Sequence, residues 1–158
     1  MSNIVDNQTL VMRDVLTYRA KMTQQELNVA MNNIGKVIKE NGANKNGCAT
    51  TSTFAIEVVD NQQVMDIEVL VPLDKEITAP DGYVFKKQFK LTNAVKIRHE
   101  GNPSLMQNSA NELMKYISDK GLTPITSGYN VTVKEPTSQA EIDNMIIDIY
   151  VGVSPNIL

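Results

Sequence analysis

The only histidine of the 158-residue chain, His99, lies in the segment KIRHEGNPSLMQ between an arginine and a glutamate. Histidine is the commonest general base of enzymes, but it acts with a nucleophile and an orienting partner. The sequence has no Gly-x-Ser-x-Gly motif, and one histidine with one cysteine makes no transition-metal site, so no metal is expected. His99 is therefore predicted at a strand end or in the following turn, with a hydrogen bond to a ligand as its alternative role.

The charged residues argue against a nucleic-acid partner. Lysine and arginine number 15 against 18 acidic residues, which gives a net charge of -3 and an isoelectric point near 5.2. The one lysine group, in YVFKKQFKL at residues 83–91, alternates with apolar residues. This alternation is typical of a strand with one solvent-exposed face and one buried face, rather than of a surface that binds single-stranded nucleic acid.

Composition indicates a soluble globular protein of one domain, residues 1–158, because 42% of the residues are hydrophobic and 21% are charged. Residues 1–20 resemble neither a signal peptide nor a membrane span, so a cytoplasmic protein without a membrane partner is expected. A chain of this length can bury a stable core without disulfides or a structural metal. The single cysteine, Cys48, cannot form an internal disulfide. No cofactor is expected.

Two segments have the periodicity of amphipathic helices. In residues 23–41 apolar residues recur at steps of three and four, Thr23 and Glu26 fit a capping box, and Gly42 follows as a left-handed stop. Residues 102–121 repeat this pattern, with Asn102 as a cap, proline at the first helical position and Gly121 as the stop.

Six stretches rich in strand-forming residues surround these helices. One stretch precedes each helix and two follow it, so the order strand, helix, strand, strand occurs twice. The six stretches are residues 11–20, 52–59, 64–73, 89–99, 128–134 and 145–153.

The two halves also align directly. An offset of 79 places Arg19 on Arg98 and Gly42 on Gly121, and an offset of 80 places Glu68 on Asp148 in the last strands. We therefore expect an α+β fold of two β-α-β-β modules, about residues 8–78 and 83–155. The modules should pair into one antiparallel sheet with both helices on one face.

The run IRHEGNPSLMQ, a helix, KGLTPITSGYNVTVKEP and then MIIDIYVGV resembles the second half of the GyrI-like (gyrase-inhibitor-like) small-molecule-binding domain, a fold of the SHS2 type, also found as the effector-binding part of AraC-type regulators. The sequence departs from the family pattern at an inserted Asn102 and at Gly152, where the family has proline. Regulators of the family carry a helix-turn-helix before this domain. The chain has no room for one, so a stand-alone binding module is expected.

The resemblance implies a groove where the two modules meet, with an acid and aromatic side chains that hold cationic or amphipathic ligands. Asp148 and Glu68 would be the acids. The alternative for each is an exposed strand acid that pairs across the sheet with a lysine. The tyrosines are as well explained by packing. The candidate ligand-binding residues are Asp148, Glu68, Tyr150, Tyr129, Tyr18 and His99.

Three functions remain open from the sequence. The first is binding of a small molecule or a peptide segment, which requires no catalysis. The second, implied by hydrolases among the relatives, is an enzyme in which Glu68 or Asp148 acts with Tyr129 to activate water. The third is a protein-interaction module, an adaptor or inhibitor that uses the sheet face or the edge strand at residues 83–91. Either a monomer or a homodimer is compatible with the sequence.

Overall fold

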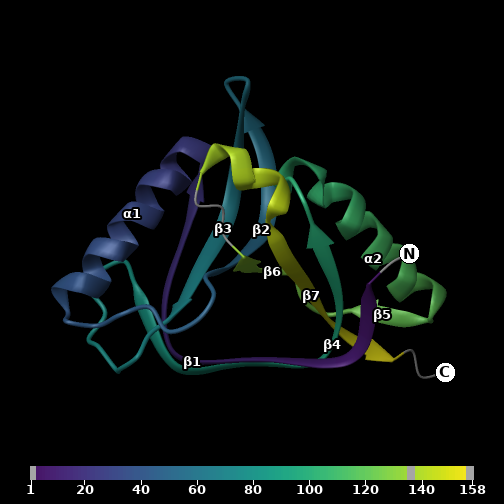
Figure 1. Cartoon of the computed structure of the whole chain (residues 1–158), viewed down its shortest axis with the longest axis horizontal. Helices are drawn as coiled ribbons and strands as arrows, with labels where there is room; N and C mark the ends of the chain where they lie inside the picture. Colours follow the sequence, from purple (N-terminus) through teal and green to yellow (C-terminus); the bar gives the residue numbers. More distant parts are fainter. Residues whose placement is uncertain (1–2, 135–137, 156–158) are drawn as a thin grey trace. The chain divides into compact units, whose positions relative to one another are not determined.

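A computed structural model describes residues 3–134 and 138–155 and has an α+β fold of antiparallel strands and two α-helices (Figure 1). Two 3-10 turns, η1 at Pro103–Leu105 and η2 at Gln139–Asn144, accompany them. The helices are α1 (Gln24–Glu40) and α2 (Met106–Asp119). The strands are β1 (Ile4–Met22), β2 (Thr50–Val59), β3 (Gln62–Pro72), β4 (Val84–Glu100), β5 (Leu122–Pro124), β6 (Tyr129–Lys134) and β7 (Ile146–Pro155).

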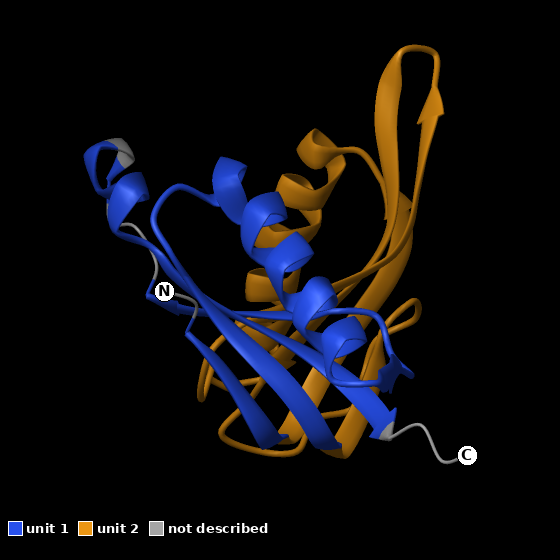
Figure 2. Cartoon of the chain, turned by 90° about the vertical axis from the view of Figure 1, so that its right-hand side faces the viewer, with its two compact units in different colours: residues 1–10, 90–158 blue, residues 11–89 orange. Residues whose placement is uncertain are grey.

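The chain forms two compact units, which Figure 2 shows in different colours. One unit comprises residues 11–89, and the other comprises residues 1–10 together with residues 90–158. The long strands β1 and β4 each run through the point at which the chain passes from one unit to the other.

In the unit of residues 11–89, β3 pairs antiparallel with both β1 and β2. Side chains of a strand alternate between its faces, so Ile67, Val69 and Val71 share one face. These three residues are buried, and Val69 and Val71 belong to a core that includes Ile34 and Ile38 of α1. This face of β3 therefore packs against α1.

Both ends of α1 have the capping that the sequence predicts. The Thr23 hydroxyl accepts a hydrogen bond from the backbone N–H of Glu26, and the Glu26 carboxylate accepts one from the N–H of Thr23. Gly42 follows the helix with a φ of +68°, the left-handed conformation that glycine adopts without strain. In the part of the chain that the structure describes, no helix is long and apolar enough to cross a membrane.

In the other unit, β7 pairs antiparallel with β4, β5 and β6, and α2 supplies Leu113 and Ile117 to the core. α2 begins at Met106, later than the sequence suggested. The Asn102 side chain accepts from the N–H of Ser104 and so caps the turn η1, which starts with Pro103. The predicted cap exists, but it starts the 3-10 turn that precedes the helix.

The strand registers of the two units correspond. Leu16 of β1 lies opposite Val71 of β3, and Val95 of β4 lies opposite Val151 of β7, which are the same positions at offsets of 79 and 80. Asp14 and Asn93, also 79 residues apart, both have positive φ, at 53° and 52°. The two units therefore repeat the same pairing and the same backbone irregularity.

Gly152 of β7 lies in a narrow space. A Cβ atom there would come within 2.9 Å of Leu91 Cδ1 and 3.0 Å of Thr126 Cγ2. The N–H of Gly152 donates a 2.9 Å hydrogen bond to the Thr126 hydroxyl. A proline at this position would lose that bond and add atoms to the filled space, which explains why this strand departs from the family pattern.

Candidate functional site

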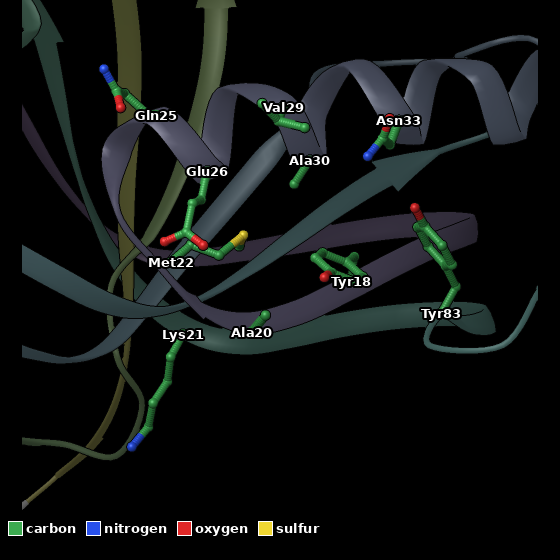
Figure 3. Close-up of a pocket in the computed structure, with 10 residues that line it drawn as sticks. All are labelled: Tyr18, Ala20, Lys21, Met22, Gln25, Glu26, Val29, Ala30, Asn33 and Tyr83. Atoms are coloured by element: carbon green, nitrogen blue, oxygen red, sulfur yellow. The ribbon is translucent and has the colours of Figure 1, made fainter.

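A cleft of about 490 Å³ lies in the unit of residues 11–89, between α1 and the end of β1 (Figure 3). Its floor is formed by β1, and its wall by the face of α1 that carries Glu26, Ala30 and Asn33. The lining residues are Tyr18, Ala20, Lys21, Met22, Gln25, Glu26, Val29, Ala30, Asn33 and Tyr83.

Two tyrosines form the aromatic part of this cleft. The rings of Tyr18 and Tyr83 are tilted by 38° with centroids 5.0 Å apart, within the range of favourable aromatic pairs. Tyr18 is held in β1 opposite Val69, and the N–H of Tyr83 donates to the Pro80 carbonyl in the turn before β4. Burial, and next the neighbouring Tyr18, raise the pKa of Tyr83, so its phenol stays neutral near pH 7.

Glu26 provides a carboxylate beside the apolar surface. Its side chain extends from α1 toward the buried Met22, and one oxygen accepts the capping hydrogen bond from Thr23. Lys21 points away from the cleft and lies 3.7 Å from Glu57. The cleft thus combines aromatic and aliphatic walls with one acid, an arrangement that suits a ligand with an apolar body and a cationic group.

Sequence reasoning identifies Tyr18 but misses Tyr83 and Glu26. The sequence pattern assigns Glu26 only to the capping box, although its position one helical turn before Ala30 places it on the face toward β1. Tyr83 directly follows Gly82, and no local sequence pattern indicates which strand this part of the chain approaches.

Asp148, the first acid that the resemblance singles out, is buried in the other unit and bound by arginine. Arg98 donates two hydrogen bonds to its carboxylate, at 2.8 and 3.0 Å, and the Lys96 ammonium lies 3.8 Å away. The hydrogen bond and the charge of Asp148 raise the pKa of Arg98. The cation that Asp148 attracts in this structure therefore belongs to the protein itself.

Tyr129 and Tyr150 face each other across strands β6 and β7, on the same side as Asp148. The Lys96 ammonium lies 5.9 Å from the centroid of the Tyr150 ring, within cation-π range. These three predicted residues are brought together, with lysine and arginine among them.

Glu68 and Tyr18 lie on opposite faces of their sheet. Tyr18 pairs with Val69 and faces α1, whereas Glu68 pairs with Arg19 and Ser52 on the other side. The Glu68 carboxylate is 3.9 Å from the Lys86 ammonium. Within this unit, only Tyr18 of the predicted residues lines the cleft described above.

His99 is the penultimate residue of β4, at the strand end as predicted, and it is 5% exposed. Its Nδ1 lies 2.9 Å from the Ser109 hydroxyl of α2, and its Nε2 lies 2.9 Å from the Asn102 carbonyl oxygen. No sequence pattern indicates Ser109 as a partner, because it lies ten residues away on the following helix.

No family model matches the sequence, and no curated protein matches it by sequence. Solved structures match by fold. EcmrR in its DNA complex has a TM-score of 0.77 at 17% identity, over 99% of this chain and 58% of that chain. The EcmrR C-terminal domain alone has a TM-score of 0.75 at 16% identity, over 99% of this chain and 98% of that domain.

Two further structures extend the comparison. A hydrolase from Listeria innocua has a TM-score of 0.62 at 13% identity, over 97% of this chain and 91% of that chain. SAV2435 bound to tetraphenylphosphonium has a TM-score of 0.50 at 12% identity, over 98% of this chain and 94% of that chain. These structures have GyrI-like folds, so the chain has the fold that the sequence resemblance implied.

Proposed function

We propose that this protein is a small-molecule-binding protein that holds an amphipathic cation in the cleft of residues 11–89. The observation that carries the proposal is the meeting of the Tyr18–Tyr83 pair with the Glu26 carboxylate in one cleft. The ligand's apolar body would lie against the tyrosine rings and the aliphatic side chains. Its cationic group would lie beside Glu26.

The physical chemistry of the cleft supports this class of ligand. A cation over an aromatic ring gains about 0.5 to 2 kcal/mol, depending on its desolvation. The carboxylate adds attraction, and its capping hydrogen bond fixes the position of one oxygen. Neither tyrosine hydroxyl makes a hydrogen bond to another described residue, so both remain available to a polar group of the ligand.

The comparisons support binding as the type of function. SAV2435 was solved with tetraphenylphosphonium, a lipophilic aromatic cation, and its fold is shared with this chain. This chain matches EcmrR both in the structure of its DNA complex and in that of its C-terminal domain. Of that domain it covers nearly the whole length.

We also propose that the chain is one domain of two β-α-β-β modules, about residues 8–78 and 83–155. The matching registers of β1 with β3 and of β4 with β7 support this, as do the left-handed residues Asp14 and Asn93. The groove predicted where the modules meet stays a prediction. The ligand roles of Asp148, Glu68, Tyr129, Tyr150 and His99 also stay predictions.

The hydrolase alternative through Asp148 or Glu68 has less support. An acid that activates water must present a free carboxylate oxygen to it. Asp148 accepts two hydrogen bonds from Arg98, and Glu68 lies beside Lys86, so both acids are already near cations of the chain. The adaptor alternative would predict binding to a protein and no response to small molecules.

Calorimetric titration with tetraphenylphosphonium tests the proposed function. We expect the wild-type protein to bind, Tyr18→Leu to weaken binding about tenfold, and Tyr83→Leu to weaken it similarly, since about 1.4 kcal/mol of aromatic contact corresponds to a factor of ten. Glu26→Gln should also weaken binding, while its amide still completes the capping box.

Tyr116→Leu is the matched control, because Tyr116 lies on α2, in the other unit. The affinity of the Tyr116→Leu variant for tetraphenylphosphonium should equal that of the wild type. Binding that survives all three cleft substitutions, or that is lost equally in Tyr116→Leu, would contradict the proposed site. Absence of binding to any cation would favour the adaptor alternative.

A further inference from the structure

The pair of His99 and Ser109 has a defined hydrogen-bond polarity. The Asn102 carbonyl oxygen can only accept, so the His99 Nε2 atom, 2.9 Å away, carries the proton. In the neutral imidazole, Nδ1 is then the unprotonated nitrogen. The Ser109 hydroxyl, 2.9 Å from it, must donate to it.

This arrangement matches the requirements for an activated hydroxyl nucleophile. The nucleophile lies within hydrogen-bond reach of a base, and a third group orients that base. Here Ser109 is the hydroxyl, His99 is the base, and the Asn102 carbonyl fixes the tautomer and the ring orientation. His99 itself is held in β4 opposite Ile147 and is almost fully buried.

A substrate has access to this pair. His99 and Ser109 line an open cleft of about 320 Å³, separate from the tyrosine-lined cleft, and Ser109 is half-buried. Asn3 and Asn108 also line it, and amide groups of this kind stabilise the oxyanion in sites of acyl transfer. Arg98, Glu100 and Glu112 also line it. Since the Arg98 guanidinium is bound to Asp148, the two glutamates leave the lining with negative charge, which disfavours anionic substrates.

We propose that Ser109 is a nucleophile for acyl transfer, with His99 as its general base, and that the substrates are small neutral or cationic acyl esters. This activity is additional to ligand binding in the cleft of residues 11–89.

The reaction balances with water as the second substrate. The Ser109 oxygen forms a bond to the acyl carbon while its proton passes to His99 Nδ1, and the ester C–O bond breaks. The proton then passes to the leaving alcohol. Water then attacks the acyl carbon and gives a proton to the same nitrogen, which passes it to the Ser109 oxygen as the acyl-serine bond breaks and the carboxylic acid leaves.

A fluorophosphonate probe tests the nucleophile directly. The Ser109 oxygen would displace fluoride from phosphorus, and mass spectrometry of the digested protein would locate the adduct. We expect one adduct, on Ser109, in the wild type and none in Ser109→Ala. Ser118→Ala, which removes an exposed serine of the same helix, should be labelled like the wild type.

His99→Gln tests whether Ser109 is reactive because His99 activates it, and not only because the probe can reach it. Loss of the general base should slow labelling about 100-fold or more. If the buried substitution prevents folding, Ser109→Cys replaces it: the thiol beside His99 should be acylated by p-nitrophenyl acetate much faster than the thiol of Ser118→Cys. An unlabelled wild-type protein, an adduct that persists in Ser109→Ala, or equal reactivity of the two thiols would overturn the proposal.

Discussion

The two arginines Arg19 and Arg98 occupy equivalent strand positions but neutralise different acids. Arg98 binds Asp148, directly opposite in the register, whereas Arg19 binds Asp66 through two hydrogen bonds and stacks 3.9 Å from the Phe54 ring. The Asp148 side chain is 6% exposed and that of Asp66 is 22% exposed. The same residue type at the same position therefore has a different energetic role in each unit.

Removal of the Arg98 charge should be costly, because it leaves a buried carboxylate with only Lys96 nearby among the described cations. We expect Arg98→Met to lower the free energy of unfolding by about 2 kcal/mol, below the range for a fully buried pair because the Arg98 side chain is 37% exposed. Arg19→Met is the matched control and should cost less, since Asp66 stays solvated. Urea denaturation measures both, and an equal or reversed order would contradict this assignment.

Tyr83 should make the free energy of unfolding depend on pH in the alkaline range. Burial and the neighbouring Tyr18 raise its pKa above the ordinary value of about 10. The unfolded chain then releases this proton at lower pH than the folded protein, so the free energy of unfolding should fall as pH rises above about 10.

Urea denaturation between about pH 9 and about pH 11.5, the range that brackets an ordinary tyrosine pKa, should show a shallower decline for Tyr83→Phe than for the wild type. Tyr116, whose pKa is raised by its hydrogen bond to Asp6, contributes equally to both proteins. Identical slopes would contradict the assigned surroundings of Tyr83.

Individual residue roles could be predicted only where a local pattern encodes them. Thr23 and Glu26 form a capping box within four residues, and the sequence was sufficient to find it. The pairs Arg98–Asp148 and Tyr18–Tyr83 join residues 50 and 65 positions apart, so they depend on strand register and on the path of a turn. No local periodicity carries that information.

At the scale of elements, α1 and its end contain two glycines with opposite expected effects. Gly35 lies inside the helix, and a Cβ atom added there would have no neighbour within 4 Å, whereas Gly42 follows the helix at a φ of +68°. Gly35→Ala should stabilise the protein by about 1 kcal/mol through helix propensity. Gly42→Ala should destabilise it by about 1 kcal/mol, because alanine is strained at positive φ.

Thermal or urea unfolding of the two variants checks this pair, and the opposite signs make each the control of the other. Destabilisation by Gly35→Ala would mean that the helix face around residue 35 is packed differently. A neutral Gly42→Ala would show that the chain leaves α1 by another turn.

The elements themselves were largely predictable. Apolar periodicity located both helices, and an enrichment in strand-forming residues located the six main strands. The short β5 strand, Leu122–Pro124, was missed, since three residues ending in proline have no alternation to detect. The predicted start of α2 was too early, because Asn102 caps a 3-10 turn as readily as an α-helix.

At the scale of the whole molecule, the internal repetition of the sequence predicted more of the fold than its composition did. The offsets of 79 and 80 residues reproduce the observed registers, including the pairs Leu16–Val71 and Val95–Val151. The candidate clefts do not repeat: the tyrosines of one are at positions 18 and 83, and the Ser–His pair is at 99 and 109. Function therefore has to be assigned to each unit separately.

The central claim, that the cleft of residues 11–89 binds an amphipathic cation, is tested most directly by NMR of the methionine methyl groups during titration with tetraphenylphosphonium. Met22 lines the cleft, and the exposed Met114 of α2 lies in the other unit. We predict a saturable shift of the Met22 resonance, assigned by Met22→Leu, with Met114 unchanged. Saturable binding that leaves Met22 unshifted would contradict the claim.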